Sequence, residues 1–154
     1  MIITEYSQSM KAALADLMTA YMAELGSSMP EAAIRGNLSD FIDAQCEKGI
    51  ICVSMAYEGE KPAGFSVFQI DTPESDWCLR PGWGFIREYY VVPAFRKHGI
   101  GRILADYTVQ ELKRMGAAGL YLTSTGAVPF WQKCGWTLTD ELTDGGQSIL
   151  VKQF

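Results

Sequence analysis

The stretch Arg96-Lys97-His98-Gly99-Ile100-Gly101 has the form Arg-x-x-Gly-x-Gly. It joins a strand-like segment, residues 84–92, to a helix-like segment, residues 99–115. A glycine-bearing turn between a strand and a helix leaves backbone N–H groups without partners, and the positive end of the helix dipole lies beside them. Glycine has no Cβ, so an anion can approach this backbone closely. The stretch therefore predicts a turn that binds a pyrophosphate.

The charge at the turn favours an anionic ligand, and the sequence lacks two other phosphate-binding motifs. Arg96, Lys97 and Arg102 place positive charge at the turn, whereas the whole chain has a net charge of −5. The sequence contains neither Gly-x-x-x-x-Gly-Lys-Ser/Thr nor Gly-x-Gly-x-x-Gly, which excludes a Walker loop and a dinucleotide fingerprint. One alternative stays open, in which the two glycines only let the start of a helix pack closely.

Two blocks of the sequence resemble motifs of one enzyme family. Glu88-Tyr89-Tyr90-Val91-Val92-Pro93, followed by Arg96-x-x-Gly99-x-Gly101, resembles motif A of the GNAT superfamily, N-acetyltransferases that use acyl-coenzyme A. Downstream, Ala127-x-x-Phe130-Trp131-x-Lys133-x-Gly135-Trp136 is similar to that family's motif B, Ala-x-x-Phe-Tyr-x-Lys-x-Gly-Phe. The blocks have the family's order and spacing and cover about a third of the chain. The resemblance implies acetyl-CoA as the donor and an amine as the acceptor.

Length and composition bound the remaining possibilities. A chain of 154 residues, with 48% hydrophobic and 20% charged residues, suits a single folded domain over residues 1–154. Its acidic balance argues against a nucleic-acid partner, because such binding depends on neutralising phosphates. Four dispersed cysteines and a single histidine indicate reduced thiols rather than a metal site. No apolar stretch of membrane-spanning length and no signal peptide is found, so we expect a cytoplasmic protein without a membrane partner.

Periodicity and turn residues divide the chain into alternating elements. Strands are expected at residues 2–6, 50–57, 63–70, 84–92, 119–124, 136–142 and 147–154. Helices are expected at residues 9–25, with Ser9 as N-cap, and at 30–48, 99–115 and 126–133, the second broken near Gly36. This order predicts an α/β fold. The resemblance implies a mixed, mostly antiparallel sheet of six to seven strands, flanked by about four helices.

The resemblance also implies where the cofactor lies. Strands 84–92 and 119–124 start side by side and then splay apart, and the pantetheine arm enters the gap like an extra strand. The expected cofactor-binding residues are Val91, Val92, Arg96, Lys97, His98, Gly99, Ile100, Gly101, Arg102, Ser124, Phe130 and Trp131. The residues themselves leave alternatives: Val91 and Val92 as strand core, Ser124 as a helix cap, and His98 as a base instead of a backbone donor.

Acetyl transfer to an amine needs a base, because an ammonium with a pKa around 10 has no free lone pair. Glu88 lies on the same face of its strand as Tyr90 and Val92 by alternation, and the family often places an acidic residue here. We therefore expect Glu88 to be the catalytic base. The alternative is a structural salt bridge to Arg80 or to the neighbours of Arg87. Family analogy assigns the tetrahedral oxyanion to the backbone N–H of Val92 or Val91.

The chain departs from the family at the proton donor for the departing thiolate. Motif B has a tyrosine where this chain has Trp131, and an indole N–H does not surrender a proton at working pH. Three solutions stay open: another tyrosine such as Tyr90 or Tyr121, a water molecule, or departure as thiolate, whose pKa is around 8.5. Cys134 lies beside motif B without a partner histidine, so we expect it to have a packing role.

The function predicted is acetyl transfer to a primary amine of a small molecule or a peptide. A non-catalytic acyl-CoA binding or sensor domain is the alternative that Trp131 suggests. A purely structural domain is disfavoured by two ordered motifs. In the family the acceptor is held by the first two helices, the loop before strand 84–92 and the C-terminal hairpin, segments that here carry acidic and aromatic residues. Relatives often form dimers, although no residue of this chain specifies a homodimer.

Overall fold

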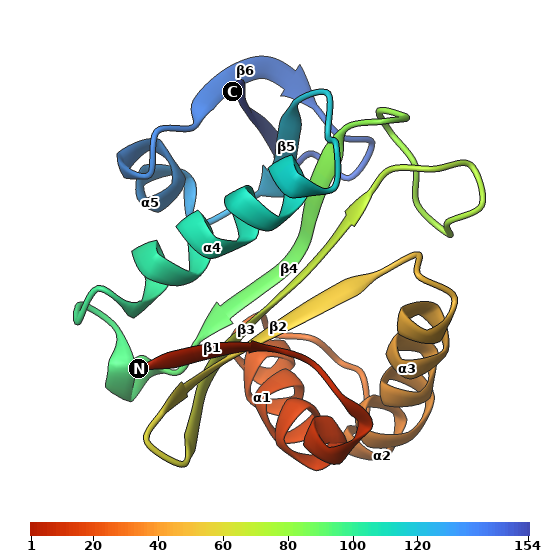
Figure 1. Cartoon of the computed structure of the whole chain (residues 1–154), viewed down its shortest axis with the longest axis vertical. Helices are drawn as coiled ribbons and strands as arrows, with labels where there is room; N and C mark the ends of the chain where they lie inside the picture. Colours follow the sequence, from red (N-terminus) through yellow and green to blue (C-terminus); the bar gives the residue numbers. More distant parts are fainter.

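The computed structural model describes all 154 residues and is built around one seven-stranded sheet (Figure 1). The strand order is β1-β2-β3-β4-β5-β7-β6, and β4–β5 is the parallel pair. The mixed, mostly antiparallel sheet expected from the sequence is thus confirmed. The strands are β1 Ile2–Glu5, β2 Cys52–Glu58, β3 Lys61–Ile70, β4 Gly84–Val91, β5 Leu120–Ser124, β6 Thr137–Leu142 and β7 Ser148–Lys152.

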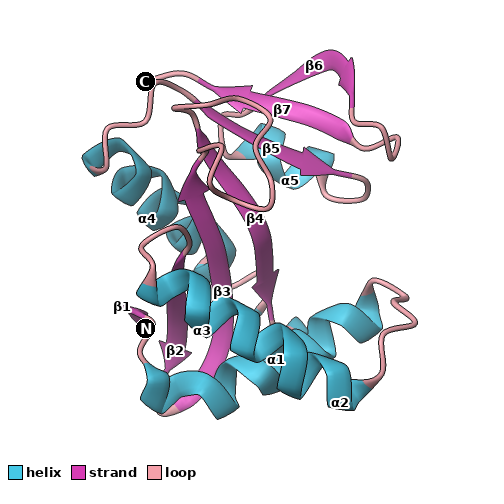
Figure 2. Ribbon diagram, turned by 90° about the vertical axis from the view of Figure 1, so that its right-hand side faces the viewer, coloured by secondary structure: helices cyan, strands magenta, loops and turns pink.

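Helices cover both faces of the sheet (Figures 1 and 2). One face carries α1 Lys11–Glu24, α2 Glu31–Ala33 and α3 Ser39–Glu47, and the other carries α4 Ile100–Arg114 and α5 Val128–Lys133. The alternation of side chains along β3 divides the core between these layers. Val67 packs in the cluster of α1 and α3, whereas its neighbour Phe68 packs in the cluster of α4 and α5.

Two expectations about the N-terminal helices meet different outcomes. The break expected near Gly36 is confirmed, because α2 and α3 are separated by a π-helical turn, Ile34–Leu38. The prediction that Ser9 caps α1 is wrong. A 3-10 turn, Gln8–Met10, precedes the helix, Met10 occupies the cap position, and no side chain caps it. The Ser9 hydroxyl instead lies 2.8 Å from that of Ser7.

The centre of the sheet opens between β4 and β5. Pairing between them covers Gly84↔Leu120, Phe85↔Tyr121 and Ile86↔Leu122 and then stops, although both strands continue. At the same point β4 contains a bulge, because Val67 of β3 faces Glu88 while Phe68 faces Ile86. Arg87 is the extra residue, and such a bulge bends its strand. The expected splay of the two strands is therefore confirmed.

No helix of this chain combines the length and the apolar character that crossing a bilayer demands.

Candidate functional site

The turn between β4 and α4 presents a row of free backbone donors. Lys97 and Gly99 have left-handed backbones, with φ of 65° and 82°. The first hydrogen bond of α4 is donated by the N–H of Ile103 to the carbonyl of Gly99, at 3.1 Å. The N–H groups of residues 97–102 donate to no protein acceptor. Because these donors lie at the positive end of a 15-residue helix, the turn can hold a di-anionic group.

The two glycines of this turn are required for different reasons. Gly99 supplies the left-handed conformation that L-residues rarely adopt. Gly101 has helical geometry, but a Cβ on it would lie 3.3 Å from the Phe130 ring and 3.7 Å from the hydroxyl of Tyr89. The first turn of α4 is thereby pressed against α5 and β4. Close packing, the alternative role considered for the glycines, therefore applies to Gly101. The N–H groups of the turn are nevertheless free.

The three basic residues at the turn have separate roles in the structure. The Arg96 guanidinium turns back toward α1, where it donates to the Val91 carbonyl at 2.9 Å and pairs with Glu24 at 2.7 Å. Arg102 donates to the carbonyl of Lys133 at 3.2 Å, which links α4 to the end of α5. Lys97 is exposed and forms no ion pair. The backbone, rather than Arg96, therefore dominates the anion-binding character of the turn.

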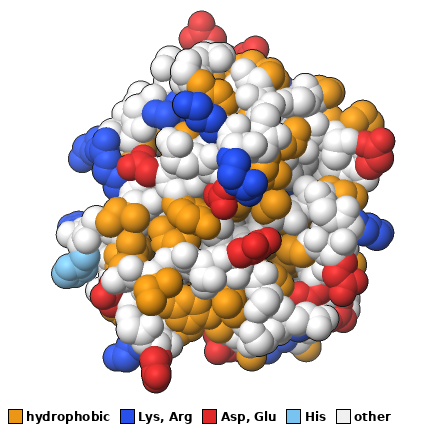
Figure 3. Space-filling model, in the orientation of Figure 1, with side chains coloured by type: hydrophobic (Ala, Val, Ile, Leu, Met, Phe, Trp, Pro, Cys, Tyr) orange, Lys and Arg blue, Asp and Glu red, His pale blue; other side chains and the backbone are white.

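His98 lies at the surface, and it is the single histidine in the chain (Figure 3). Its side chain lines a cavity of about 450 Å³ together with Phe95, Ile103 and the N-terminal Met1. Neither β5 nor Glu88 lines this cavity. The structure therefore supports the expectation that His98 contributes its backbone to the turn, rather than acting as a base.

Beyond the bulge, β4 turns alternate backbone groups toward the gap. Val92 donates its N–H to the Ala63 carbonyl at 2.8 Å, so this predicted oxyanion donor is already occupied. Val91 faces Gly64 of β3 in the register between such bonds. In an antiparallel ladder, a residue at that position directs its N–H and carbonyl away from the partner strand. The Val91 N–H therefore points into the gap between β4 and β5, while its side chain packs with Ile100.

Glu88 lies on β4 just after the bulge and faces α1, on the side expected from alternation. Its Oε2 accepts a hydrogen bond from the Tyr21 hydroxyl. Burial raises the pKa of Glu88 above its ordinary value, while the Tyr21 hydrogen bond and the Arg87 charge oppose that rise. The salt-bridge alternative is wrong, because Arg87 pairs with Asp76 at 2.8 Å and Arg80 pairs with Glu141 at 2.5 Å.

The structure removes two candidates for the thiolate proton donor. Tyr121 is fully buried, and its hydroxyl donates to Asp71 at 2.5 Å while accepting from the Trp77 indole at 3.0 Å. Tyr90 is buried in the α1 layer beneath the Arg96 guanidinium. Trp131 is 4% exposed and packs against Trp136, with ring centroids 5.6 Å apart. Trp131 is thus a core residue in this structure.

Tyr89 is a residue of this region that sequence reasoning passed over. Its ring lies 4.8 Å from that of Trp131 and 5.9 Å from that of Phe130, and its hydroxyl donates to the Gly101 carbonyl. Tyr89 therefore ties the splayed part of β4 to both motif segments. Alternation from Glu88 places it on the α4 face of the sheet, which is the signal that could have identified it.

Two residues near motif B have structural roles. The Ser124 hydroxyl accepts a hydrogen bond from the Ala127 N–H at 3.1 Å, which orders the turn before α5. The helix-cap interpretation of Ser124 is wrong, because Ala127 occupies the cap position of α5 and no side chain caps it. Cys134 is buried among Trp131 and Trp136, and burial raises the pKa of its thiol. The expectation that Cys134 packs in the core is therefore confirmed.

Comparisons with known proteins agree with this geometry. The model of the acetyltransferase (GNAT) family matches residues 12–136. Among solved structures, the PaiA N-acetyltransferase from Thermoplasma acidophilum in complex with coenzyme A is similar over 99% of this chain and 98% of that one. Its TM-score is 0.74 and its sequence identity 17%. An aminoglycoside 6'-N-acetyltransferase complexed with coenzyme A is similar over 99% and 97%, with a TM-score of 0.75 and 15% identity.

A third solved structure extends the similarity over both chains. The ribosomal-protein-alanine N-acetyltransferase from Brucella melitensis is covered at 100%, as is this chain, with a TM-score of 0.76 and 13% identity. At such identities these likenesses show the fold alone. A comparison with curated proteins found no match to the sequence.

Proposed function

The chain belongs to the acetyltransferase (GNAT) family, and from this premise we propose how it transfers an acetyl group from acetyl-CoA to a primary amine. The observation that carries the proposal is the turn at residues 97–102, whose N–H groups have no protein acceptor and lie next to the gap between β4 and β5. Arg102 and the Phe130 ring border the same turn. These groups suit the pyrophosphate and the adjoining pantetheine of the donor.

Glu88 is the proposed base. Its carboxylate takes one proton from the acceptor's ammonium, and the neutral amine nitrogen then forms a bond to the acetyl carbon. As the C–S bond breaks and coenzyme A leaves as its thiolate, the nitrogen gives up a second proton to water and becomes the neutral amide nitrogen. The raised pKa of Glu88 brings this carboxyl closer to the operating pH, where general bases are most effective. The proton passes from Glu88 to solvent after the transfer.

Val91 is the proposed oxyanion donor, because its N–H points into the gap and the Val92 N–H is already donated to Ala63. No side chain is assigned to protonate the departing sulfur. Trp131 has no acidic proton, and the ordinary thiol pKa of about 8.5 allows coenzyme A to leave as its thiolate. A tyrosine at motif B is therefore dispensable in this mechanism.

The acceptor is proposed to be a small molecule or a peptide that carries a primary amine. Two acidic residues that would suit a cation, Glu24 and Asp76, are paired with Arg96 and Arg87. Glu88 forms no ion pair with a basic residue, so its carboxylate is available to the incoming ammonium. Association of two chains into a homodimer is part of this proposal by family analogy, and sedimentation of the purified protein tests it.

The test is a release assay for free thiol with acetyl-CoA and a panel of amines, run beside calorimetric titration with coenzyme A. We expect saturable binding of coenzyme A and thiol release with at least one amine. Binding without release from any amine would favour the non-catalytic sensor instead. Absence of heat on titration would overturn the assignment of the turn to the pyrophosphate.

A further inference from the structure

We propose that Tyr21 is a positioning residue, which holds Glu88 by one oxygen and thereby leaves the other oxygen to meet the amine. The inference deepens the proposed function and rests on it. It starts from the hydrogen bond that the Tyr21 hydroxyl donates to Oε2 of Glu88. The two residues lie 67 positions apart, on α1 and on β4, so the contact depends on the packing of α1 against the sheet.

The Tyr21 ring is fixed by two aromatic neighbours. It makes an edge-on contact with Phe65 of β3, with ring centroids 5.6 Å apart at 87°. It also contacts Tyr90 of β4, with centroids 5.5 Å apart. Such pairs prefer defined geometries, so the ring has little freedom to turn away. A phenylalanine would satisfy these contacts equally well, and the hydroxyl therefore needs a separate explanation.

The carboxylate of Glu88 has two oxygens in different situations. Oε2 accepts from Tyr21, whereas Oε1 accepts no hydrogen bond from the protein. The fully buried side-chain oxygens and nitrogens without a partner are Asp43 Oδ2 and Trp136 Nε1, so Oε1 of Glu88, which also lacks a partner, keeps some contact with solvent. Tyr21 thus anchors the inner oxygen, and the outer oxygen is free to receive a proton.

The charged groups around Glu88 make its ionisation sensitive to Tyr21. From its own strand, Arg87 contributes positive charge, but this charge is shared with Asp76 of the β3–β4 loop. From α1, the facing group is the Tyr21 hydroxyl, and from β3 the residue opposite Glu88 is the apolar Val67. A hydrogen bond donated to a carboxylate favours its charged form. Removal of the Tyr21 hydroxyl should therefore raise the pKa of Glu88.

The experiment is Tyr21→Phe in the 154-residue chain, which keeps the ring and removes the hydroxyl. The ¹³C resonance of the Glu88 carboxyl is titrated in the free protein, and kcat/KM is measured against pH with the best amine of the panel. We expect the titration midpoint and the acidic limb of kcat/KM both to move up by about one pH unit. At a pH below the limb, this corresponds to roughly tenfold lower activity.

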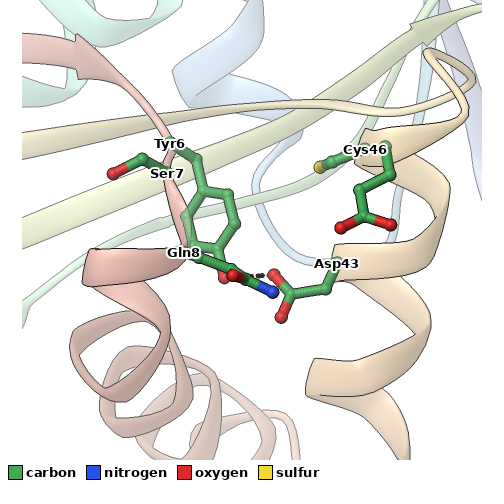
Figure 4. Close-up of a pocket in the computed structure, with 6 residues that line it drawn as sticks. Tyr6, Ser7, Gln8, Asp43 and Cys46 are labelled. Carbon is green, nitrogen blue, oxygen red and sulfur yellow. Dashed lines mark hydrogen bonds between the residues drawn. The ribbon is translucent and has the colours of Figure 1, made fainter.

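Tyr6→Phe is the matched control. Tyr6 donates to Asp43 at 2.5 Å beside a cavity of about 290 Å³, away from Glu88, so the change removes the same kind of bond elsewhere (Figure 4). We expect it to leave the Glu88 midpoint and the pH profile unchanged. An unmoved Glu88 midpoint in Tyr21→Phe would overturn the inference. The midpoint is read without turnover, so this outcome is separable from failure of the proposed activity, which the wild-type release assay decides.

Discussion

The turn at residues 97–102 and the centre around Glu88 are built in opposite ways. In the turn, the groups that suit an anion are backbone N–H groups of consecutive residues, held by two glycines and one helix. The position and the pKa of the Glu88 side chain depend instead on the bulge in β4, on the hydrogen bond from Tyr21 of α1 and on burial. Local sequence therefore specifies the turn, whereas the arrangement around Glu88 exists only once distant elements have packed.

The largest loss of activity should come from a change at Glu88. Glu88→Gln removes the base, and we expect kcat to fall by roughly 10²- to 10⁴-fold, the usual contribution of general base catalysis. Wild-type activity should decline as pH falls through the raised pKa of Glu88, because the carboxylate becomes protonated, and the variant should lack this limb. Calorimetry should show coenzyme A binding unchanged. A variant that keeps the wild-type rate and pH profile would remove Glu88 from the mechanism.

The turn at residues 97–102 is tested by adding side-chain atoms at one of its glycines. Gly101→Val places a Cβ 3.3 Å from the Phe130 ring and two methyl groups beyond it, so the first turn of α4 must shift. Overpacking of this kind costs roughly 1–3 kcal/mol, and we expect coenzyme A to bind about a hundredfold more weakly by calorimetry. Gly36→Ala is the control, because nothing lies within 4 Å of a Cβ there. Equal affinity in both variants would contradict the assigned turn.

Trp131→Tyr asks whether the missing family tyrosine limits the rate. Trp131 is 4% exposed in the core of the α4 layer, so a smaller ring leaves a cavity and buries a hydroxyl. We expect a loss of about 2 kcal/mol in the free energy of unfolding, measured by urea denaturation, and no gain in kcat. A tenfold gain in kcat would show instead that protonation of the sulfur limits the natural enzyme.

The smallest effect should come from the charge that surrounds the turn. Glu24 is paired with Arg96 at 2.7 Å, and both side chains are more than 40% exposed. Glu24→Gln frees the guanidinium, and we expect coenzyme A affinity to rise about threefold at low salt, with the gain lost at high salt. Asp16→Asn is the control, because Asp16 pairs with Arg35 elsewhere on the surface. If coenzyme A affinity changes neither with Glu24→Gln nor with salt concentration, the backbone alone is responsible for binding the anion.

The order of elements and the free backbone turn could be predicted from the sequence because both follow from local patterns. The splay could be predicted because two ordered motifs resemble those of a family in which these strands separate. Glycines, a strand and a helix in succession determine the turn at Gly99 regardless of what packs around it. Other features follow from contacts that no local pattern encodes. The occupied N–H of Val92 depends on the β3 register, and the orientation of Arg96 toward Glu24 depends on where α1 ends.

The same limit explains Tyr21 and Tyr89. Tyr21 belongs to the apolar face of its helix by periodicity, and nothing in that pattern shows that its hydroxyl reaches a carboxylate on β4. Tyr89 stands inside the motif that revealed the family, but its neighbours Phe130 and Trp131 come from α5. Both residues become recognisable only when the two helical layers are placed against the sheet.

The extra residue in β4, Arg87, shifts the alternation of side chains between the two faces of the sheet by one position. Ile86 belongs to the α4 layer and Tyr90 to the α1 layer, although four positions of regular strand would return a side chain to its original face. The part of β4 before Arg87 pairs with β5, and the part after it directs the Glu88 side chain toward α1. Deleting Arg87 would remove the bulge and straighten β4 while Glu88 stayed opposite Val67 on the α1 face. The opening between β4 and β5 would close although the carboxylate remained, a loss that no single side-chain exchange can reproduce.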